Sequence, residues 1–322
     1  MPLIRSLRFK TLTGTLLITA VTLAAPLSQG AANPQHKNMV LIPAGDFLMG
    51  SNKVDKSGRG KEFGTAKPFY LDEHPLHKVH TKAYWIDRYE VTNARYKAFV
   101  IGANYQVPDL WRKNGYLLSR KVLNVADTAK LRDLAAKLFK LDMDTRKMTK
   151  GQLLDAIEKD QKGYDDLPVT DTSWYNANDY CRWVGKRLPT EAEWERAARG
   201  DHPRVYPWGD KWNAKNLNAG DDPRWTHGVS PVGSYPQGRS PYGVYDMAGN
   251  VMEWVADWYR PYPGNTYKSK DFGEKYKVLR GGGWGGIGHY AIHHFYRTAY
   301  RFYIDPTDAF NDVGFRCAAD AK

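Results

Sequence analysis

Cysteine is scarce in this sequence, with only Cys181 and Cys317 among 322 residues. The two are too far apart for a C-x-x-C redox motif, and no zinc-finger pattern is present. The glycine run after Arg280 lacks the G-x-G-x-x-G spacing of a dinucleotide site. Helix-turn-helix patterns, RNA-binding patterns and long Lys/Arg blocks are absent too, so nucleic acid is not expected as a partner.

Long apolar runs are also missing after the N-terminus, so no membrane span is expected in the mature protein. The first 32 residues contain three cations, then an apolar stretch from Thr11 to Ala25, then a small-residue cleavage pattern. This order is typical of a secretory signal peptide. It predicts a signal peptide at 1–32 and a secreted, periplasmic domain at 33–322.

In an exported chain, two cysteines most simply form one disulfide. A reactive pair is the alternative, although no histidine is adjacent to either cysteine. The formal net charge is +12, and removing the three signal-peptide cations leaves 12 − 3 = +9. This excess fits an anionic partner or a generally basic exported protein.

Turns and aromatic rings dominate the composition, with 29 Gly, 18 Pro, 11 Trp and 21 Tyr. Alternating apolar residues predict two short strands in 38–51, joined by a turn, and strand structure in 77–87. A helical insertion is predicted at about 105–166. N-cap residues and apolar stripes predict five helices. The first begins after Thr92 or Asn93, and three extend over 127–141, over 150–160 after Thr149 and over 174–185 after Ser173. The last begins after Thr190, which is expected to form a capping box with Glu193.

The stretch from Pro241 to Tyr259 contains the turn Gly249-Asn250, followed by Glu253 and Asp257. Carboxylates, an Asn side chain and turn carbonyls are the hard oxygen ligands that calcium takes. A tight turn with two aromatic core anchors explains the same residues without a metal. The sequence leaves both interpretations open.

Eight segments stand in order between residues 38 and 319, interrupted by the insertion. They are MVLIPAGDFLMGS, DEHPLHKV, YEVTNARYKAFV, PVTDTSWYNANDYCRWVGKRLPTEAEWERAARG, YPWGD, SPVGSYPQGRSPYGVYDMAGNVMEWVADWY, VLRGGGW and GFRCA. In this order they resemble the formylglycine-generating-enzyme family, also called the sulfatase-modifying-factor domain. The resemblance implies a single compact α+β domain, related to C-type lectins, with little regular secondary structure.

The resemblance also implies calcium sites in Asn-containing loops. One would use Asn216 and Leu217, with Asp222 as the nearest acidic candidate. The other would use Asn250, Val251 and Glu253. In the same family alignment, the two cysteines fall on a structural disulfide.

The active site departs from the family pattern, which uses two cysteines that bind copper. Counting back from Gly314–Cys317 places these positions at His293 and Thr298, whereas counting forward from Arg280 places the first at Ala291. None is a cysteine, so a Cu(I)–thiolate site is excluded. Formylglycine generation by that mechanism is therefore not expected.

Three histidines, His289, His293 and His294, cluster where the cysteines would be. Imidazole suits copper, iron and zinc, so a copper or iron site is one hypothesis. Solvated or core histidines are the other.

Two functions follow from the resemblance. The first is a periplasmic accessory or modifying protein, oxidase-like, acting in the maturation of a peptide, cofactor or enzyme. The alternative is a non-catalytic, lectin-like binding module for a protein or glycan partner. Loss of both cysteines favours binding, whereas the His and Tyr cluster favours chemistry.

Overall fold

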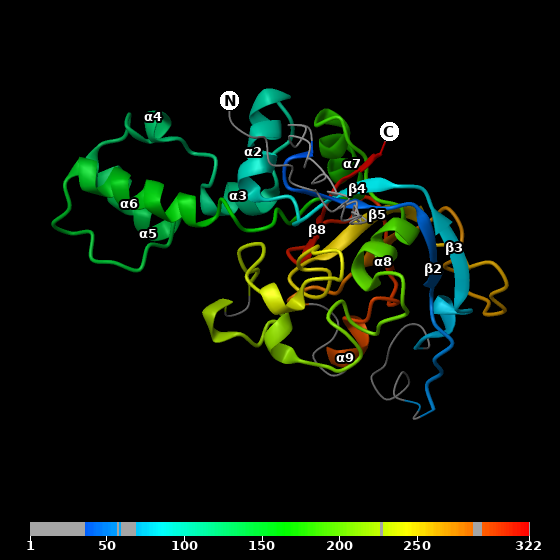
Figure 1. The fold of residues 1–322 in the computed structure, drawn as a ribbon. Coiled ribbons are helices and arrows are strands. Elements are labelled where there is room, and N and C mark those ends of the chain that lie inside the picture. The colour runs from blue at the N-terminus through cyan, green and yellow to red at the C-terminus, as the bar shows by residue number, and fades with distance from the viewer. Residues whose placement is uncertain (1–35, 57, 59–68, 226–227, 286–291, 322) are drawn as a thin grey trace, which may run out of the picture. The chain divides into compact units, whose positions relative to one another are not determined.

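The computed structural model describes most of the chain beyond its N-terminus (Figure 1). The chain divides into one unit at 1–37 and another at 38–322, and the elements given below lie in the second. The predicted signal peptide lies outside the described residues, which are 36–56, 58, 69–225, 228–285 and 292–321.

The strands form three small sheets, with orders β1-β4-β9, β2-β3 and β7-β6-β5-β8. In the four-stranded sheet, β5 runs antiparallel to β6 and parallel to β8. The strands are β1 (Met39–Ile42), β2 (Gly45–Met49), β3 (His77–Thr81), β4 (Tyr84–Asp87), β5 (Met252–Trp258), β6 (Lys277–Arg280), β7 (Phe302–Ile304), β8 (Val313–Phe315) and β9 (Ala318–Asp320).

Both strand predictions are confirmed, but the pairing differs from a simple hairpin. β1 pairs with β4, whereas β2 pairs with β3 in another sheet. The turn at Pro43 therefore passes the chain from one sheet to the next. Proline suits this position because it cannot donate a ladder hydrogen bond.

Helices begin at the predicted caps. The Thr92, Thr149, Ser173 and Thr190 side chains each accept a first-turn N–H. Thr190 forms the predicted capping box with Glu193. The α-helices are α2 (Asn93–Gly102), α3 (Asp109–Asn114), α4 (Arg120–Leu123), α5 (Thr128–Lys137), α6 (Lys150–Gly163), α7 (Trp174–Trp183), α8 (Glu191–Arg199) and α9 (Ile292–Phe295). The 3₁₀ turns are η2 (Leu71–Glu73), η3 (Ala214–Asn216), η4 (Pro223–Trp225) and η5 (Pro236–Gly238).

Residues 105–166 contain α3 to α6, and α6 packs against both α4 and α5 (Figure 1). Leu131 of α5 and Leu153 and Ile157 of α6 are fully buried in an apolar cluster of this segment. The insertion therefore has a core of its own. Sequence periodicity found its two longer helices but not the short α3 and α4.

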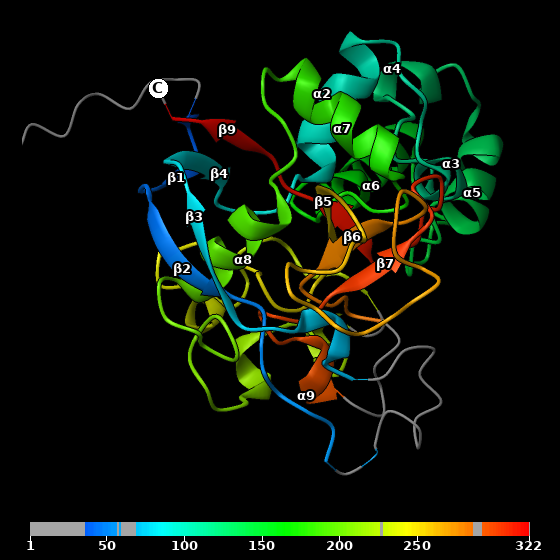
Figure 2. The same cartoon turned by 90° about the vertical axis from the view of Figure 1, so that its right-hand side faces the viewer.

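Two larger cores meet at β5, because successive side chains of a strand point to opposite faces. Trp254 packs in one cluster with Phe315, whereas Val255 packs in the other with Trp194 of α8. α8 also packs against β2, β3 and β6, so it lies between two sheets (Figures 1 and 2). These contacts fix the end of α8, and the loop that follows it borders the site described below.

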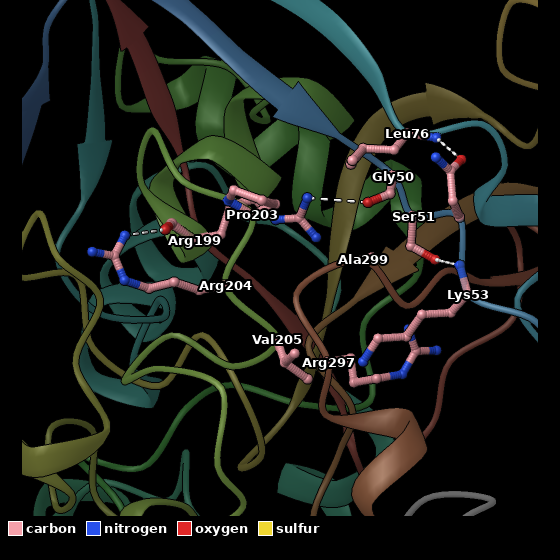
Figure 3. A pocket seen from close by; sticks show the side chains of 11 residues that line it. Gly50, Ser51, Lys53, Leu76, Arg199, Pro203, Arg204, Val205, Arg297 and Ala299 are labelled. Atoms are coloured by element: carbon pink, nitrogen blue, oxygen red, sulfur yellow. Dashed lines mark hydrogen bonds between the residues drawn. The ribbon is translucent and has the colours of Figure 1, made fainter.

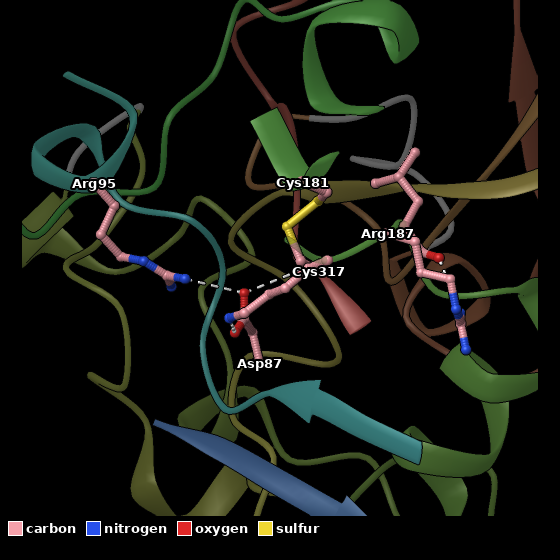
Figure 4. Close-up of a disulfide and its surroundings, with 7 residues drawn as sticks. Asp87, Arg95, Cys181, Arg187 and Cys317 are labelled. Atoms are coloured by element: carbon pink, nitrogen blue, oxygen red, sulfur yellow. Dashed lines mark hydrogen bonds and ion pairs between the residues drawn. A yellow bond between two sulfur atoms is a disulfide. The ribbon is translucent and has the colours of Figure 1, made fainter. Parts of the chain in front are cut away.

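The predicted disulfide is confirmed. Cys181 of α7 is bonded to Cys317, with Cα atoms 5.6 Å apart (Figure 4). Beside it, buried Asp87 accepts the Cys317 N–H at 3.2 Å and pairs with Lys186 and Arg95. The bond ties the middle of the chain to its C-terminal strands.

Replacing both cysteines by Ser should lower the free energy of unfolding by about 2–5 kcal/mol. The reason is that the bond closes a long loop, 136 residues in sequence separation, and so restricts the unfolded chain. Urea unfolding of the double variant beside the wild type measures the change. Two free thiols in unfolded, unreduced wild type would contradict the bond.

Candidate functional site

The segment from α9 to Arg301 occupies the place where the family resemblance put the active site. It packs against the loop after α8. The Thr298 N–H donates to the Val205 carbonyl at 2.8 Å, and the Tyr206 hydroxyl donates to the His293 carbonyl at 3.1 Å. The loop and the segment therefore hold each other in position.

The two described histidines of this segment have different surroundings. The exposed ring of His293 stacks on Trp212, with centroids 4.5 Å apart. His294 is buried, and its ring stacks on Phe69 with centroids 3.8 Å apart. Its Nδ1 lies 3.1 Å from Nη2 of Arg297. His289 lies outside the described residues.

These surroundings do not fit a metal centre built on the two adjacent imidazoles. His294 is enclosed by aromatic rings and a guanidinium, which repels cations. Within the part of the chain that the structure describes, no group of three His, Cys, Asp or Glu is arranged to hold a metal. A redox metal stays a hypothesis that depends on His289.

Thr298, the second aligned position, is fully buried. Its hydroxyl donates to the Arg204 carbonyl at 2.6 Å and accepts from Arg199 Nε at 3.1 Å. Its carbonyl accepts from Arg280 at 2.5 Å. With these bonds, Thr298 links the end of α8, the loop after it and the end of β6. Its hydroxyl and carbonyl are therefore engaged and not free to bind a substrate.

A cavity of about 290 Å³ is lined by Arg297 and Ala299, the two sequence neighbours of Thr298 (Figure 3). Its wall includes Lys53, Arg199, Arg204 and Arg297, contributed by the loop after β2, the end of α8, the loop that follows and the segment after α9. No acidic residue lines it among those described. The cavity is therefore a strongly basic pocket.

Carboxylates behind the wall hold two of these arginines. Arg297 makes a two-pronged ion pair with Glu73, at 2.6 and 2.8 Å, and both side chains are buried. Arg199 pairs with Glu195 at 3.0 Å and donates to the carbonyls of Leu48 and Gly50. The guanidiniums are thus held rigidly at the edge of the cavity.

Asn250, the predicted calcium ligand, is a buried hydrogen-bond centre. Its Oδ1 accepts from Ser230 N at 2.8 Å, from Ser230 Oγ at 3.2 Å and from Asn218 Nδ2 at 3.3 Å. Its Nδ2 donates to Glu90 at 3.0 Å. Asn250 has φ of 66°, in the left-handed region expected for the turn.

Glu253 is also committed to protein partners. Arg316 donates to both of its oxygens at 2.6 Å, and Trp194 Nε1 adds a third bond at 2.9 Å. As arranged, the Asn250 and Glu253 side chains do not fit a calcium ion, because their oxygens are engaged. Calcium there would have to draw on main-chain oxygens such as that of Val251.

The other predicted calcium positions lie in η3 and just after it. Asn216 is buried, with its carbonyl against Gly238, and Leu217 packs in an apolar cluster. Asp222 pairs with Arg224 at 2.6 Å and accepts from the Tyr235 hydroxyl. The side chain that reaches Asn250 from this loop is Asn218, which the sequence reasoning had not singled out.

Two further carboxyl groups lie close to Asn250. Burial, reinforced by the neighbouring Asp246, raises the pKa of Glu90 well above its usual range. Burial likewise raises the pKa of Asp246, whose Oδ2 accepts from Gly233 N at 2.6 Å. These carboxyls are built into the core and line neither of the cavities described here.

A second cavity, of about 780 Å³, lies against the start of α8 and the end of β5. Burial, with the charge of Glu191, raises the pKa of its Asp257 to about 6. Burial lowers the pKa of its Lys277 to about 8, and that ammonium lies about 4 Å over the rings of Trp174 and Trp258. This cavity therefore holds groups of both signs.

The sequence reasoning missed the cations of the basic pocket. Arg297 stands in an otherwise aromatic segment, HHFYRTAYRF, together with Arg301, which lines the second cavity, and both arginines are buried. Buried arginines require carboxylate partners, so this pattern could have indicated an internal charge network. Lys53 gave no such signal, because it belongs to an ordinary polar loop.

Residues 24–321 match a family described as the sulfatase-modifying factor enzyme 1-like domain. The chain is 32% identical to inactive C-alpha-formylglycine-generating enzyme 2 of Bos taurus, over 95% of both chains. It is also 32% identical to the formylglycine-generating enzyme of Streptomyces coelicolor, over 94% of this chain and 97% of that protein. Hercynine oxygenase of Mycolicibacterium smegmatis is 33% identical, over 76% of this chain and 54% of that protein.

Among solved structures, PvdO from Pseudomonas aeruginosa is similar, with a TM-score of 0.55 and 25% identity, covering 88% of this chain and 94% of that one. The variable protein 1 of Treponema denticola has the same TM-score at 20% identity, covering 87% of this chain and 94% of that one, which shows a shared fold. These similarities agree with the predicted single compact domain of mixed α and β structure.

Replacing Arg316 by Met should lower the free energy of unfolding by about 3–5 kcal/mol, because Glu253 would stay buried without its countercharge. Urea unfolding at neutral pH measures the loss. Arg316→Met/Glu253→Gln should regain part of it, since the uncompensated charge is gone. A single variant as stable as the wild type would refute the assigned role of the pair.

Asp257 should make the protein less stable as pH rises from about 4 to about 6. The folded state, with pKa about 6, holds a proton there that the unfolded chain, with pKa near 3.8, has released. The loss is about 2–3 kcal/mol across this window. Asp257→Asn should flatten this part of the stability profile, as measured by denaturant unfolding at several pH values, and an unchanged slope would contradict the assignment.

Proposed function

Because the chain belongs to the sulfatase-modifying factor family of formylglycine-generating enzymes and their relatives, we propose that it is an exported, thiol-free member that assists maturation. It acts in the periplasm on a peptide, cofactor or enzyme by binding a protein or peptide partner. Its basic pocket lies beside the position aligned with a family cysteine.

One observation carries this proposal: Cys181 and Cys317, the whole cysteine content of the chain, are bonded to each other. Copper(I) in the family's site requires soft thiolate ligands, and this chain has none to offer. The aligned Thr298 is buried and bonded on both sides. What remains at this place is a surface for recognition, in line with relatives named as inactive.

Export is supported by the order of charges and apolar residues in the first 32 positions and by the disulfide, since such bonds persist in oxidising compartments. In the part of the chain that the structure describes, no helix is long and apolar enough to cross a membrane. Mass spectrometry of protein recovered from the periplasm would place the mature N-terminus near residue 33.

Incubated with a cysteine-containing sulfatase peptide, copper and oxygen, the pure protein should form no formylglycine, because it lacks both thiolates. Mass spectrometry of the peptide measures the product. The Streptomyces coelicolor enzyme, treated identically, is the positive control. Formylglycine above the no-enzyme background would overturn the thiol-free assignment.

A second candidate is an oxidase-like modifying enzyme with a copper or iron centre. The exposed imidazole of His293 in the aligned segment, together with a relative named as an oxygenase, favours it. The centre would need His289 beside His293. Neutral imidazoles would bind the metal, so affinity would fall as pH drops through about 6.5.

Metal analysis of periplasm-purified protein separates the two candidates. Near-zero copper and iron in both the wild type and His289→Ala/His293→Ala supports binding alone. Stoichiometric redox metal that the double variant loses supports the oxidase. The same samples test the calcium predicted from the sequence. Bound calcium would be lost to a chelator with a fall in melting temperature, whereas an unchanged melting temperature would agree with the engaged Asn250 and Glu253 side chains.

A further inference from the structure

Strand β3 is an edge strand whose main chain is open on one side. It belongs to a two-stranded sheet, so β2 is its one neighbour, with Gly45–Met49 paired against His77–Thr81. Apart from this ladder, no hydrogen bond joins a main-chain N–H or C=O of β3 to any residue that the structure describes. Every second residue of an edge strand turns these groups away from its neighbour. β3 therefore presents donors and acceptors along its free side.

The other strand of this sheet receives bonds that β3 does not. Arg199 of α8 donates to the Leu48 carbonyl at 2.7 Å, and Arg196 donates to the Gly45 carbonyl at 3.0 Å. α8 thus supplies donors to the carbonyls of β2. Among the described residues, no side chain donates to a carbonyl of β3, so this is the edge that a further strand could occupy.

The cavity of about 780 Å³ lies along β3. Residues 77–79 of the strand line it, and so do residues 260–263 of the loop after β5. Figures 1 and 2 show β3 between β2 and this loop, and Tyr262 of the loop contacts His77 with ring centroids 5.0 Å apart. Tyr262 and Val79 also pack in one apolar cluster. The free side of β3 therefore borders a cavity with an apolar wall.

The two faces of β3 differ in chemistry, because side chains alternate along a strand. On one face, Val79 packs in the apolar cluster. On the other, exposed Lys78 and His80 each lie 2.7 Å from Asp46. Lys82, exposed just after the strand, continues the same alternation. One carboxylate thus serves a face that carries two lysines and a histidine.

We propose that β3 accepts an extended peptide segment of the partner as an added strand, with apolar side chains directed into the cavity and acidic side chains beside Lys78. The proposal rests on the peptide-binding role proposed above and adds the place, the conformation and the side-chain pattern of the bound segment. Main-chain hydrogen bonds at a sheet edge supply affinity, and the alternating side chains of the added strand supply specificity.

Charge selects the acidic pattern on the outer face. Lysines on an edge strand discourage pairing with other strands, and acidic side chains on the incoming strand turn that repulsion into attraction. Inside the cavity the charges are nearly balanced, because Arg301 pairs with Glu191 and Lys277 lies near Asp257. Uncharged side chains therefore suit the inner face.

The test uses the full mature protein and an end-blocked heptapeptide of alternating Glu and Val, with binding measured by fluorescence anisotropy. In an extended peptide, the N–H groups of the Glu residues point to one edge and those of the Val residues to the other. N-methylation of all Val or of all Glu therefore blocks one edge at a time. One methylated peptide should bind at least about tenfold more weakly, and the other should bind like the parent.

Hydrogen exchange read by mass spectrometry locates the bound peptide, since the amides of residues 77–81 should exchange more slowly in the complex. Lys78→Glu should weaken the Glu-Val peptide about fivefold and strengthen a Lys-Val peptide by a similar factor, because it reverses the charge beside the added strand. Lys121→Glu is the matched control, a reversal at an exposed lysine of α4 in the insertion. Circular dichroism confirms that each variant is folded.

Failure of the edge site and failure of the proposed function give different results. Methylated peptides that both bind, or that both lose binding, overturn the edge site, and so does unchanged exchange at residues 77–81. Equal effects of Lys78→Glu and Lys121→Glu overturn it as well, and so does the absence of binding by both parent peptides. The proposed function fails instead by the metal analysis above, if redox metal is present and the histidine double variant loses it.

Discussion

Buried arginine–carboxylate pairs hold this turn-rich chain together. Arg280 and Arg301 share Glu191, and Arg316 clamps Glu253, all with almost no solvent exposure. Removing one partner would leave a buried charge uncompensated, which costs far more than the pair itself contributes. Each pair also joins distant segments, so the network fixes a fold in which regular strands are short.

The same network shapes the site. Glu73 holds Arg297 from behind, although the two are 224 residues apart in sequence, and Arg280 reaches the carbonyl of Thr298. The segment aligned with the family's catalytic cysteines is thus tied into the core through its arginines. Positive charge lines the cavity at its edge, where Lys53 forms no ion pair with any carboxylate that the structure describes. The absence of free thiols and the basic lining of the cavity are the grounds on which we propose recognition rather than redox chemistry.

Burial also explains why acidic residues beside turns were ambiguous in the sequence. Glu253 and Asn250 have the ligand types of a calcium loop, but in the fold they satisfy Arg316, Trp194 and Ser230. A carboxylate that binds a metal ion and one that pairs with an arginine cannot be told apart in the sequence. Only the distant partner decides which use it serves.

The sequence by itself determined the features that depend on neighbouring residues or on composition. Helix caps such as Thr190 act within one turn, and two cysteines that are the only ones in a chain have one possible intramolecular pairing. Tertiary structure alone decided that β1 and β2 join different sheets, that His293 and His294 have separate surroundings, and that four cations line one cavity. The physical reason is range: strand pairing, packing and ion pairs between residues far apart in the sequence leave no local pattern.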